Sequence, residues 1–131
     1  MDFGKILLVD DDPDDRSIIV DALQMLEAGD IISFAENGEA ALEMLDKYSN
    51  SWKSLCLIVL DLNMPKMNGT QTLRTLKEDD RFKNIPVIIY STSINPFEKE
   101  KCMHLGANAY ITKPVSFKEG METAKLFLSL C

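Results

Sequence analysis

Short apolar runs rich in valine, isoleucine and leucine recur along the chain, and segments with helical spacing separate them. Apolar runs of this length are typical of parallel strands that helices cover on both faces. The runs predict strands over residues 6–9 and 31–35, a strand that ends at Asp61, a strand that ends at Ser91, and a strand over residues 109–112. Such alternation indicates an α/β fold built on a parallel sheet.

Helix signals stand between these strands. Asp12 and Pro13 are a capping acid and a first-turn proline, and the apolar residues after them recur at helical spacing up to Gly29, which we expect to end the helix. Four further helices are expected from Asn37-Gly38, from Gly69, from Asn95-Pro96 and from Ser116. Five strands alternating with five helices favour a doubly wound, flavodoxin-like sheet of order 2-1-3-4-5, which brings the carboxyl ends of strands one, three and five together.

The length and charge of the chain limit what it can be. Its 131 residues suffice for one domain, which we expect to span residues 1–131. The net charge of −7 argues against nucleic-acid and anionic-membrane binding, and no apolar stretch approaches the ~20 residues of a membrane helix. Because no signal peptide opens the sequence, the cytoplasm is the expected location.

The cysteines predict no metal site. Cys56, Cys102 and Cys131 lack metal-ligand spacing, and any disulfide scheme leaves one of them unpaired. We interpret Cys56 and Cys102 as small hydrophobic residues.

Polar residues follow the predicted strands where the strands end. Asp10 and Asp11 follow the first strand, Asp61 ends the third, Ser91 ends the fourth and Lys113 follows the fifth. The carboxyl ends of parallel strands meet at one edge of a sheet, so these side chains should converge there. Carboxylates gathered in this way repel one another, and an all-oxygen set suits Mg²⁺. Asp61 is then a plausible nucleophile toward phosphorus, with Lys113 and Ser91 contacting the phosphoryl oxygens.

Other acids lie close to this edge in the sequence. Asp12, Asp14 and Asp15 are better explained as acids at a helix start than as metal ligands, because they face the positive end of the helix dipole.

Four motifs occur in order: V-D-D after strand one, D-x-N-M-P-x-M-[ND]-G after strand three, a hydroxyl residue ending strand four, and K-P after strand five. Over essentially its whole length the chain therefore resembles the receiver domain of bacterial two-component response regulators. The resemblance implies that Asp61 accepts a phosphoryl group from a phosphohistidine on a sensor kinase. It further implies that Asp11, Asp61 and the backbone carbonyl of Asn63 bind Mg²⁺, with Asp10 acting largely through water.

The same resemblance implies a switch. Ser91 would be the switch hydroxyl, which phosphorylation pulls toward the new oxygens, and Tyr110 the switch aromatic residue, which then turns inward. It also implies a cis peptide bond between Lys113 and Pro114. Thr92 departs from the commoner small residue and could narrow access to the phosphoryl group.

The expected function is that of a single-domain response regulator, because no output domain follows the fifth helix. It would be a regulatory protein rather than an enzyme, with intrinsic autophosphorylation and autodephosphorylation chemistry. An alternative is a shuttle that passes phosphate to a histidine-phosphotransfer protein. A more distant alternative, an aspartyl-phosphate-type phosphatase, is disfavoured because Asp61-Leu62-Asn63 lacks a second acid two residues on.

The expected partners are a sensor histidine kinase or histidine-phosphotransfer protein and a downstream protein target. The face formed by helix four, strand five and helix five is the candidate surface, also for a homodimer. In the last helix, the spacing predicts a buried stripe and places Leu126 and Leu130 opposite it, with Phe127 on the flank; the stripe consists of Phe117, Met121, Ala124 and Leu128.

Overall fold

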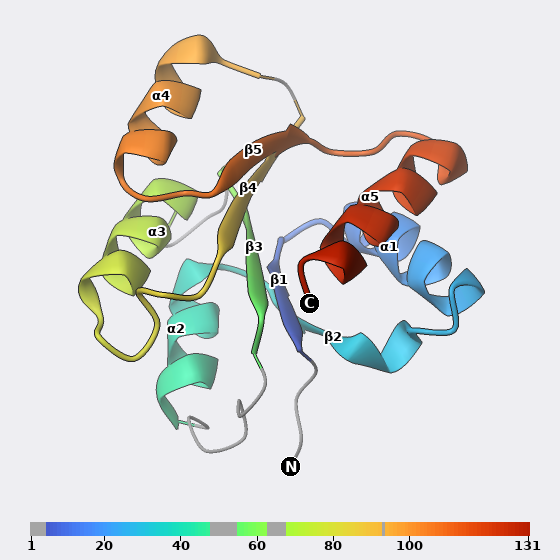
Figure 1. Ribbon diagram of the computed structural model, residues 1–131, viewed down its shortest axis with the longest axis horizontal. Coiled ribbons are helices and arrows are strands. Elements are labelled where there is room, and N and C mark those ends of the chain that lie inside the picture. The colour runs from blue at the N-terminus through green and yellow to red at the C-terminus, as the bar shows by residue number, and fades with distance from the viewer. Residues whose placement is uncertain (1–4, 48–54, 63–67, 93) are drawn as a thin grey trace.

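The computed structural model describes residues 5–47, 55–62, 68–92 and 94–131 (Figure 1). Five strands form one parallel sheet in the order β2-β1-β3-β4-β5, as the sequence predicts. The strands are β1 (Ile6–Val9), β2 (Ile32–Ala35), β3 (Leu57–Asp61), β4 (Val87–Ser91) and β5 (Ala109–Thr112).

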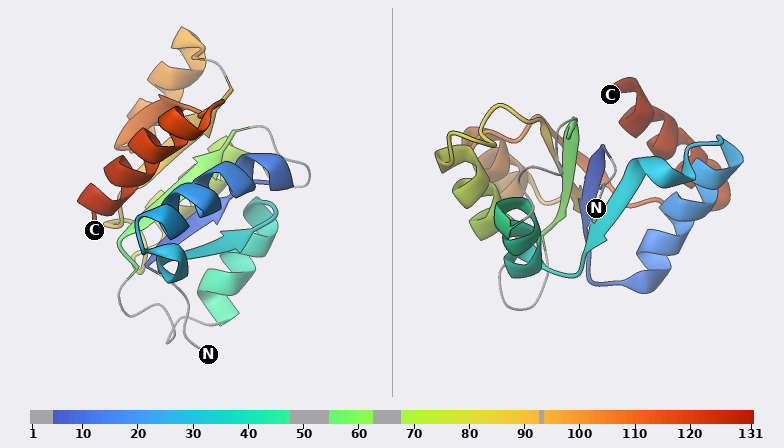
Figure 2. Two further views of the ribbon diagram at one scale, coloured as in Figure 1. Left: turned by 90° about the vertical axis from the view of Figure 1, so that its right-hand side faces the viewer. Right: turned by 90° about the horizontal axis from the view of Figure 1, so that it is seen from below.

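Helices cover both faces of the sheet (Figures 1 and 2). They are α1 (Pro13–Met25), α2 (Gly38–Lys47), α3 (Gly69–Glu78), α4 (Pro96–His104) and α5 (Phe117–Ser129). Alternate residues of β1 divide between two cores: Ile6 and Leu8 pack with α1 and α5, whereas Leu7 and Val9 pack with the side of α2, α3 and α4. All residues of β1 are buried, which explains why its sequence is a continuous apolar run.

Helix α1 ends earlier than the sequence predicts. Its last residue is Met25, and Glu27 adopts a left-handed backbone conformation with φ of 58°. The Ala28 N–H donates to the Leu23 carbonyl, so the helix is closed by the hydrogen bonds that normally accompany a glycine at this position. Gly29 instead begins a 3₁₀ turn, η1 (Gly29–Ile31), and β2 therefore begins at Ile32 rather than Ile31.

Helix α5 is rotated relative to the predicted stripe. Phe117 is 53% exposed, whereas Phe127 is fully buried and packs on the Tyr90 ring with centroids 6.1 Å apart. Gly120 permits this rotation, because a Cβ there would lie 2.7 Å from the Ile18 side chain of α1. The predictions of a buried Phe117 and of Phe127 on the flank were thus wrong, while Leu126 lies on the exposed side as expected.

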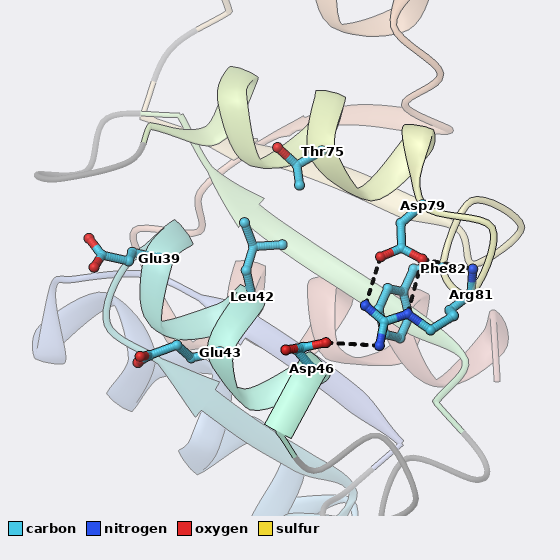
Figure 3. A pocket seen from close by; sticks show the side chains of 8 residues that line it. All are labelled: Glu39, Leu42, Glu43, Asp46, Thr75, Asp79, Arg81 and Phe82. Carbon is cyan, nitrogen blue, oxygen red and sulfur yellow. Dashed lines mark hydrogen bonds and ion pairs between the residues drawn. The ribbon is translucent and has the colours of Figure 1, made fainter.

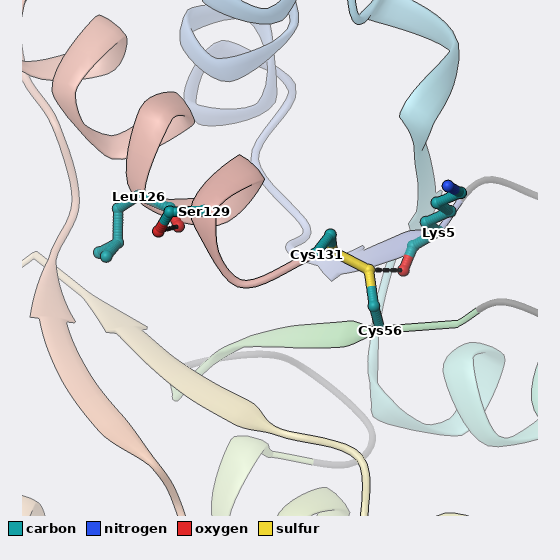
Figure 4. Close-up of a disulfide and its surroundings, with 5 residues drawn as sticks. All are labelled: Lys5, Cys56, Leu126, Ser129 and Cys131. Atoms are coloured by element: carbon teal, nitrogen blue, oxygen red, sulfur yellow. Dashed lines mark hydrogen bonds between the residues drawn. A yellow bond between two sulfur atoms is a disulfide. The ribbon is translucent and has the colours of Figure 1, made fainter.

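A disulfide joins Cys56 to Cys131 across 75 residues of sequence, with Cα atoms 5.5 Å apart (Figure 4). It links the residue just before β3 to the second residue beyond α5, at the sheet edge where the strands begin. The Cys56 Sγ atom also lies 3.0 Å from the Lys5 carbonyl oxygen. The interpretation of Cys56 as a small hydrophobic residue was therefore wrong, whereas Cys102 is a buried free cysteine as expected.

Within the described residues, none of the helices has the length and apolar character needed to cross a membrane.

Candidate functional site

Three acids meet at the carboxyl edge of the sheet. Asp10 directly follows β1 and is fully buried, Asp61 is the buried last residue of β3, and Asp11 is exposed. One carboxylate oxygen from each lies within 4.8 Å of the others. The parallel pairing of β1 with β3 places these strand ends side by side, so the convergence predicted from the sequence is present.

The first turn of α1 fixes the position of Asp10. The Asp12 N–H donates to Asp10 Oδ1 at 2.9 Å, and the Asp12 side chain in turn accepts from the Asp14 N–H at 2.9 Å. Asp12 is therefore the N-cap of α1, with Pro13 at the first helical position. The interpretation of Asp12 as a helix-start acid is supported by this geometry.

Lys113 places a positive charge among these acids. It follows β5 and is 5% exposed. Its backbone N–H donates to the Ser91 carbonyl oxygen at 2.6 Å. Its Nζ atom lies 3.1 Å from Oδ2 of both Asp10 and Asp61, and 2.7 Å from Oδ2 of Asp15. The ammonium thus bridges three carboxylates from two strand ends and one helix.

In this cluster, burial and charge pairing shift the pKa values of the side chains in opposite directions. Burial raises the pKa of Asp10 to about 6, although the Asp12 N–H and the Lys113 ammonium act against this rise. Burial lowers the pKa of Lys113, but the hydrogen bond with Asp15 and the charges of Asp10 and Asp61 outweigh it and the net shift is upward. Lys113 therefore stays charged at neutral pH, and a proton or another cation can neutralise part of the remaining acid charge.

The acids fit a hard metal ion. Asp10 Oδ2 has no hydrogen-bond partner among the described residues, and its contact with Lys113 is an ion pair without hydrogen-bond alignment. A buried carboxylate oxygen in this condition is suited to a cation or to a cation-bound water. The donor set of Asp10, Asp11 and Asp61 consists of oxygen atoms, which Mg²⁺ prefers. Asn63, whose carbonyl was predicted as a further ligand, lies outside the described residues.

The predicted switch residues lie on the neighbouring strands. Ser91 is buried at the end of β4, where it pairs in register with Thr112, and Thr92 is exposed. Tyr110 is 7% exposed and packs in the core on the α2, α3 and α4 side, so it already lies inward. The Lys113–Pro114 peptide bond is trans, as most bonds before proline are, so the expected cis bond was wrong.

Comparison with known proteins identifies the family. Residues 6–125 match the family model described as the response regulator receiver domain. The chain belongs to this family. Receiver domains are regulatory parts of two-component signalling, and the family binds Mg²⁺ at an acidic pocket.

Relatives and solved structures agree with this assignment. The receiver domain is 36% identical over 121 residues to the chemotaxis protein CheY1 of Helicobacter pylori, covering 90% of this chain and 94% of the relative. It is similar to the phosphorylated cyanobacterial phytochrome response regulator RcpA, with a TM-score of 0.83 and 33% identity over 95% of this chain and 91% of that one. The Mn²⁺-bound response regulator Rcp1 gives a TM-score of 0.81 at 31% identity, with 95% and 91% covered.

Two residues of the site were not recognised from the sequence of this receiver domain. Gly69 begins α3 directly against Asp61, and a Cβ at Gly69 would overlap the Asp61 carbonyl oxygen. Its signal was present, because glycine ends the motif that starts at Asp61. Asp15 was interpreted as a helix-start acid alone, yet it makes the shortest contact with Lys113. No sequence signal distinguishes this contact, because an acid in a first helical turn is already explained by the helix dipole.

A separate hollow lies between α2 and α3 (Figure 3). It is lined by acidic and apolar side chains together with Arg81, whose guanidinium pairs with Asp46 at 3.0 Å and with Asp79 at 2.9 Å. Because these acids already neutralise Arg81, the hollow offers no positive site for an anionic ligand.

Proposed function

We propose that this receiver domain acts in the cytoplasm as a response regulator whose Asp61 accepts a phosphoryl group from a phosphohistidine of a sensor kinase. The observation that carries the proposal is the hydrogen bond of Lys113 Nζ to Asp61 Oδ2 inside a group of acids that can hold a metal ion. A buried carboxylate with an adjacent fixed cation is suited to phosphoryl transfer, since both nucleophile and transferred oxygens need positive charge nearby.

In the proposed step, a carboxylate oxygen of Asp61 forms a bond to phosphorus, and the bond from phosphorus to the histidine nitrogen breaks. The electron pair of that bond leaves with the imidazole, which takes up a proton from water. Lys113 holds the carboxylate in place and offers N–H donors to the phosphoryl oxygens. Mg²⁺, held by Asp11 and Asp61 with Asp10 contributing through water, would supply additional positive charge for these oxygens.

Ser91 and Tyr110 are proposed to report the modification. Ser91 ends the strand next to β3, and Lys113 is tied to it through the backbone. A phosphoryl group offers strong acceptors to a hydroxyl at this position, so movement of Ser91 would reach β5 and the Tyr110 side chain beside it. In this structure Tyr110 is inward, so the proposed change is a shift between this arrangement and an outward one.

Acetyl phosphate tests the phosphoacceptor proposal. In the presence of Mg²⁺ the intact mass should rise by about 80 Da, the mass of one phosphoryl group, and peptide mapping should place the gain at Asp61. Chelation of Mg²⁺ before the donor is added should suppress the gain. A modification found on another residue, or one indifferent to chelation, would contradict the proposal.

We further propose that α4, β5 and α5 form the partner surface, with a second copy of the chain as its occupant. α4 and α5 lie on either side of the edge strand β5 (Figure 1). Both helices carry exposed apolar side chains. They are Phe97 and Met103 on α4, Phe117 and Leu126 on α5, and Leu130, the residue that caps α5. Exposed apolar side chains that form a contiguous patch mark protein contact sites, and we propose that these residues contribute to such a patch.

Charging the far end of α5 tests this surface. The double variant Leu126→Glu, Leu130→Glu should weaken self-association in sedimentation experiments by about tenfold or more, since two apolar contacts are replaced by desolvated charges. Labelling of Asp61 by acetyl phosphate should be unaffected and serves as the control for folding. Unchanged association would place the partner surface elsewhere.

A further inference from the structure

Lys113 has an acidic partner that does not come from a strand end. Asp15 belongs to the first turn of α1, and its Oδ2 atom lies 2.7 Å from Lys113 Nζ. The distances from Nζ to Asp10 and Asp61 are both 3.1 Å. The shortest contact of the ammonium is thus with an acid outside the group that could hold a metal ion.

The position of Asp15 at a helix start does not account for this contact. Asp14 lies in the same first turn and gains the same favourable interaction with the helix dipole. The Asp14 side chain is exposed, whereas the Asp15 side chain is 24% exposed and turned toward Lys113. Asp14 is therefore a matched reference for the effect of charge at this helix end.

The hydrogen bonds of Lys113 are limited in number. An ammonium group has three N–H donors, and Asp15 and Asp61 each accept one. The Lys113 Nζ atom also stands 5.7 Å from the centre of the Tyr90 ring, which limits where the ammonium can move. A phosphoryl group on Asp61 would compete with Asp15 for these donors. Water can hydrate the partly exposed Asp15 when Lys113 turns away from it.

Asp15 also changes the charge of the site. With Asp10 and Asp61 it places three carboxylates around one ammonium, and Asp11 adds a fourth acid at the same edge of the sheet. The negative charge of Asp15 favours the binding of a cation by Asp10, Asp11 and Asp61. The contact of Asp15 with Lys113 also reduces competition between the ammonium and that cation for Asp61. Both effects oppose the binding of an anion such as a phosphoryl group at Asp61.

We propose that Asp15 is a positioning residue that shares Lys113 with Asp61, favouring the bound cation and weakening the hold of Lys113 on the phosphoryl group. This inference rests on the proposed phosphoacceptor function. Asp15 would thereby set how firmly the phosphoryl group is retained, without itself touching the reacting atoms.

The test compares Asp15→Asn with Asp14→Asn, which removes the same charge from the same helix turn. Calorimetry measures the affinity for Mg²⁺, and ¹⁹F NMR measures the affinity for beryllofluoride, a stand-in for the phosphoryl group, at saturating Mg²⁺. Asp15→Asn should weaken Mg²⁺ binding and strengthen beryllofluoride binding, each by about three- to tenfold. Asp14→Asn should change either affinity by less than about twofold, because its side chain is exposed.

The opposite directions of the two changes separate positioning from damage to the structure. A variant that was merely misfolded would bind both ions more weakly. Weakening of both in Asp15→Asn, or equal effects of the two variants, would overturn the role of Asp15 while leaving the phosphoacceptor function standing. Failure of the wild-type protein to bind beryllofluoride with Mg²⁺ would instead overturn the proposed function, and this inference with it.

Discussion

Replacing Asp61 with asparagine should abolish phosphoryl labelling by acetyl phosphate, so that the gain of about 80 Da expected for the wild-type protein is lost. An amide is a poor nucleophile toward phosphorus and cannot form an acyl phosphate. Asp61 is buried at the end of β3 within reach of Lys113, and the neighbouring Asp10 is held by the Asp12 N–H and by the Lys113 ammonium. We therefore expect Asp10 not to replace it.

The fold should survive this substitution. Asparagine has nearly the shape of aspartate, and Lys113 keeps its contacts with Asp15 at 2.7 Å and with Asp10 at 3.1 Å. Loss of one acid also relieves repulsion within the cluster, so the thermal midpoint should not fall. Asp14→Asn, an exposed substitution of the same kind, should be labelled like the wild type. Undiminished labelling of Asp61→Asn would show that another residue is the acceptor.

The sheet was predictable because its signal is local and repeated. Every residue of β1, β3 and β4 is buried, so each strand is a continuous apolar run that ends where the backbone leaves the core. The topology then brings Asp10, Asp61 and Lys113 to one edge without further information. These site residues could therefore be proposed from the sequence, and the predicted meeting of the acids is present in the structure.

The end of α1 and the buried side of α5 were not predicted correctly. At each place the sequence allows two local conformations, and the tertiary structure selects one of them. Both Glu27 and Gly29 follow α1, and glycine is the favoured residue for a left-handed position, yet Glu27 occupies it. Phe117 and Phe127 are both apolar residues of α5, and the fit of Gly120 on Ile18 decides which one is buried. Residue preferences and apolar spacing show which alternative is more common, but packing between elements determines which one is adopted.

Asp15 and the disulfide depend on contacts between distant segments. An acid in a first helical turn is already explained by the helix dipole, so nothing in the sequence pointed to a partner 98 residues away. Pairing of Cys56 with Cys131 requires the amino edge of β3 and the end of α5 to meet, which follows from the complete fold rather than from cysteine spacing.

Loss of this disulfide should have the largest effect on stability. The bond closes a loop with a sequence separation of 75 residues. The chain-entropy treatment gives about 4 kcal/mol of stabilisation for a loop of this length, an upper value because unfolded chains retain some structure. Cys131→Ser should therefore lower the unfolding free energy by about 2–4 kcal/mol in denaturant titrations. Thiol counting under denaturing, non-reducing conditions should find Cys102 alone in the wild type, and Cys56 in addition in the variant.

Reductant supplies the matched control for this effect. A dithiol reductant should lower the denaturation midpoint of the wild-type protein to that of Cys131→Ser, whereas the variant should not respond, because it has no bond to reduce. Cys102 is buried and takes no part in either state, so it does not confuse the comparison. A wild-type midpoint indifferent to reductant would contradict the prediction. Asp61 should be labelled by acetyl phosphate to the same extent in both redox states under native conditions, because the disulfide lies at the sheet edge opposite the acids.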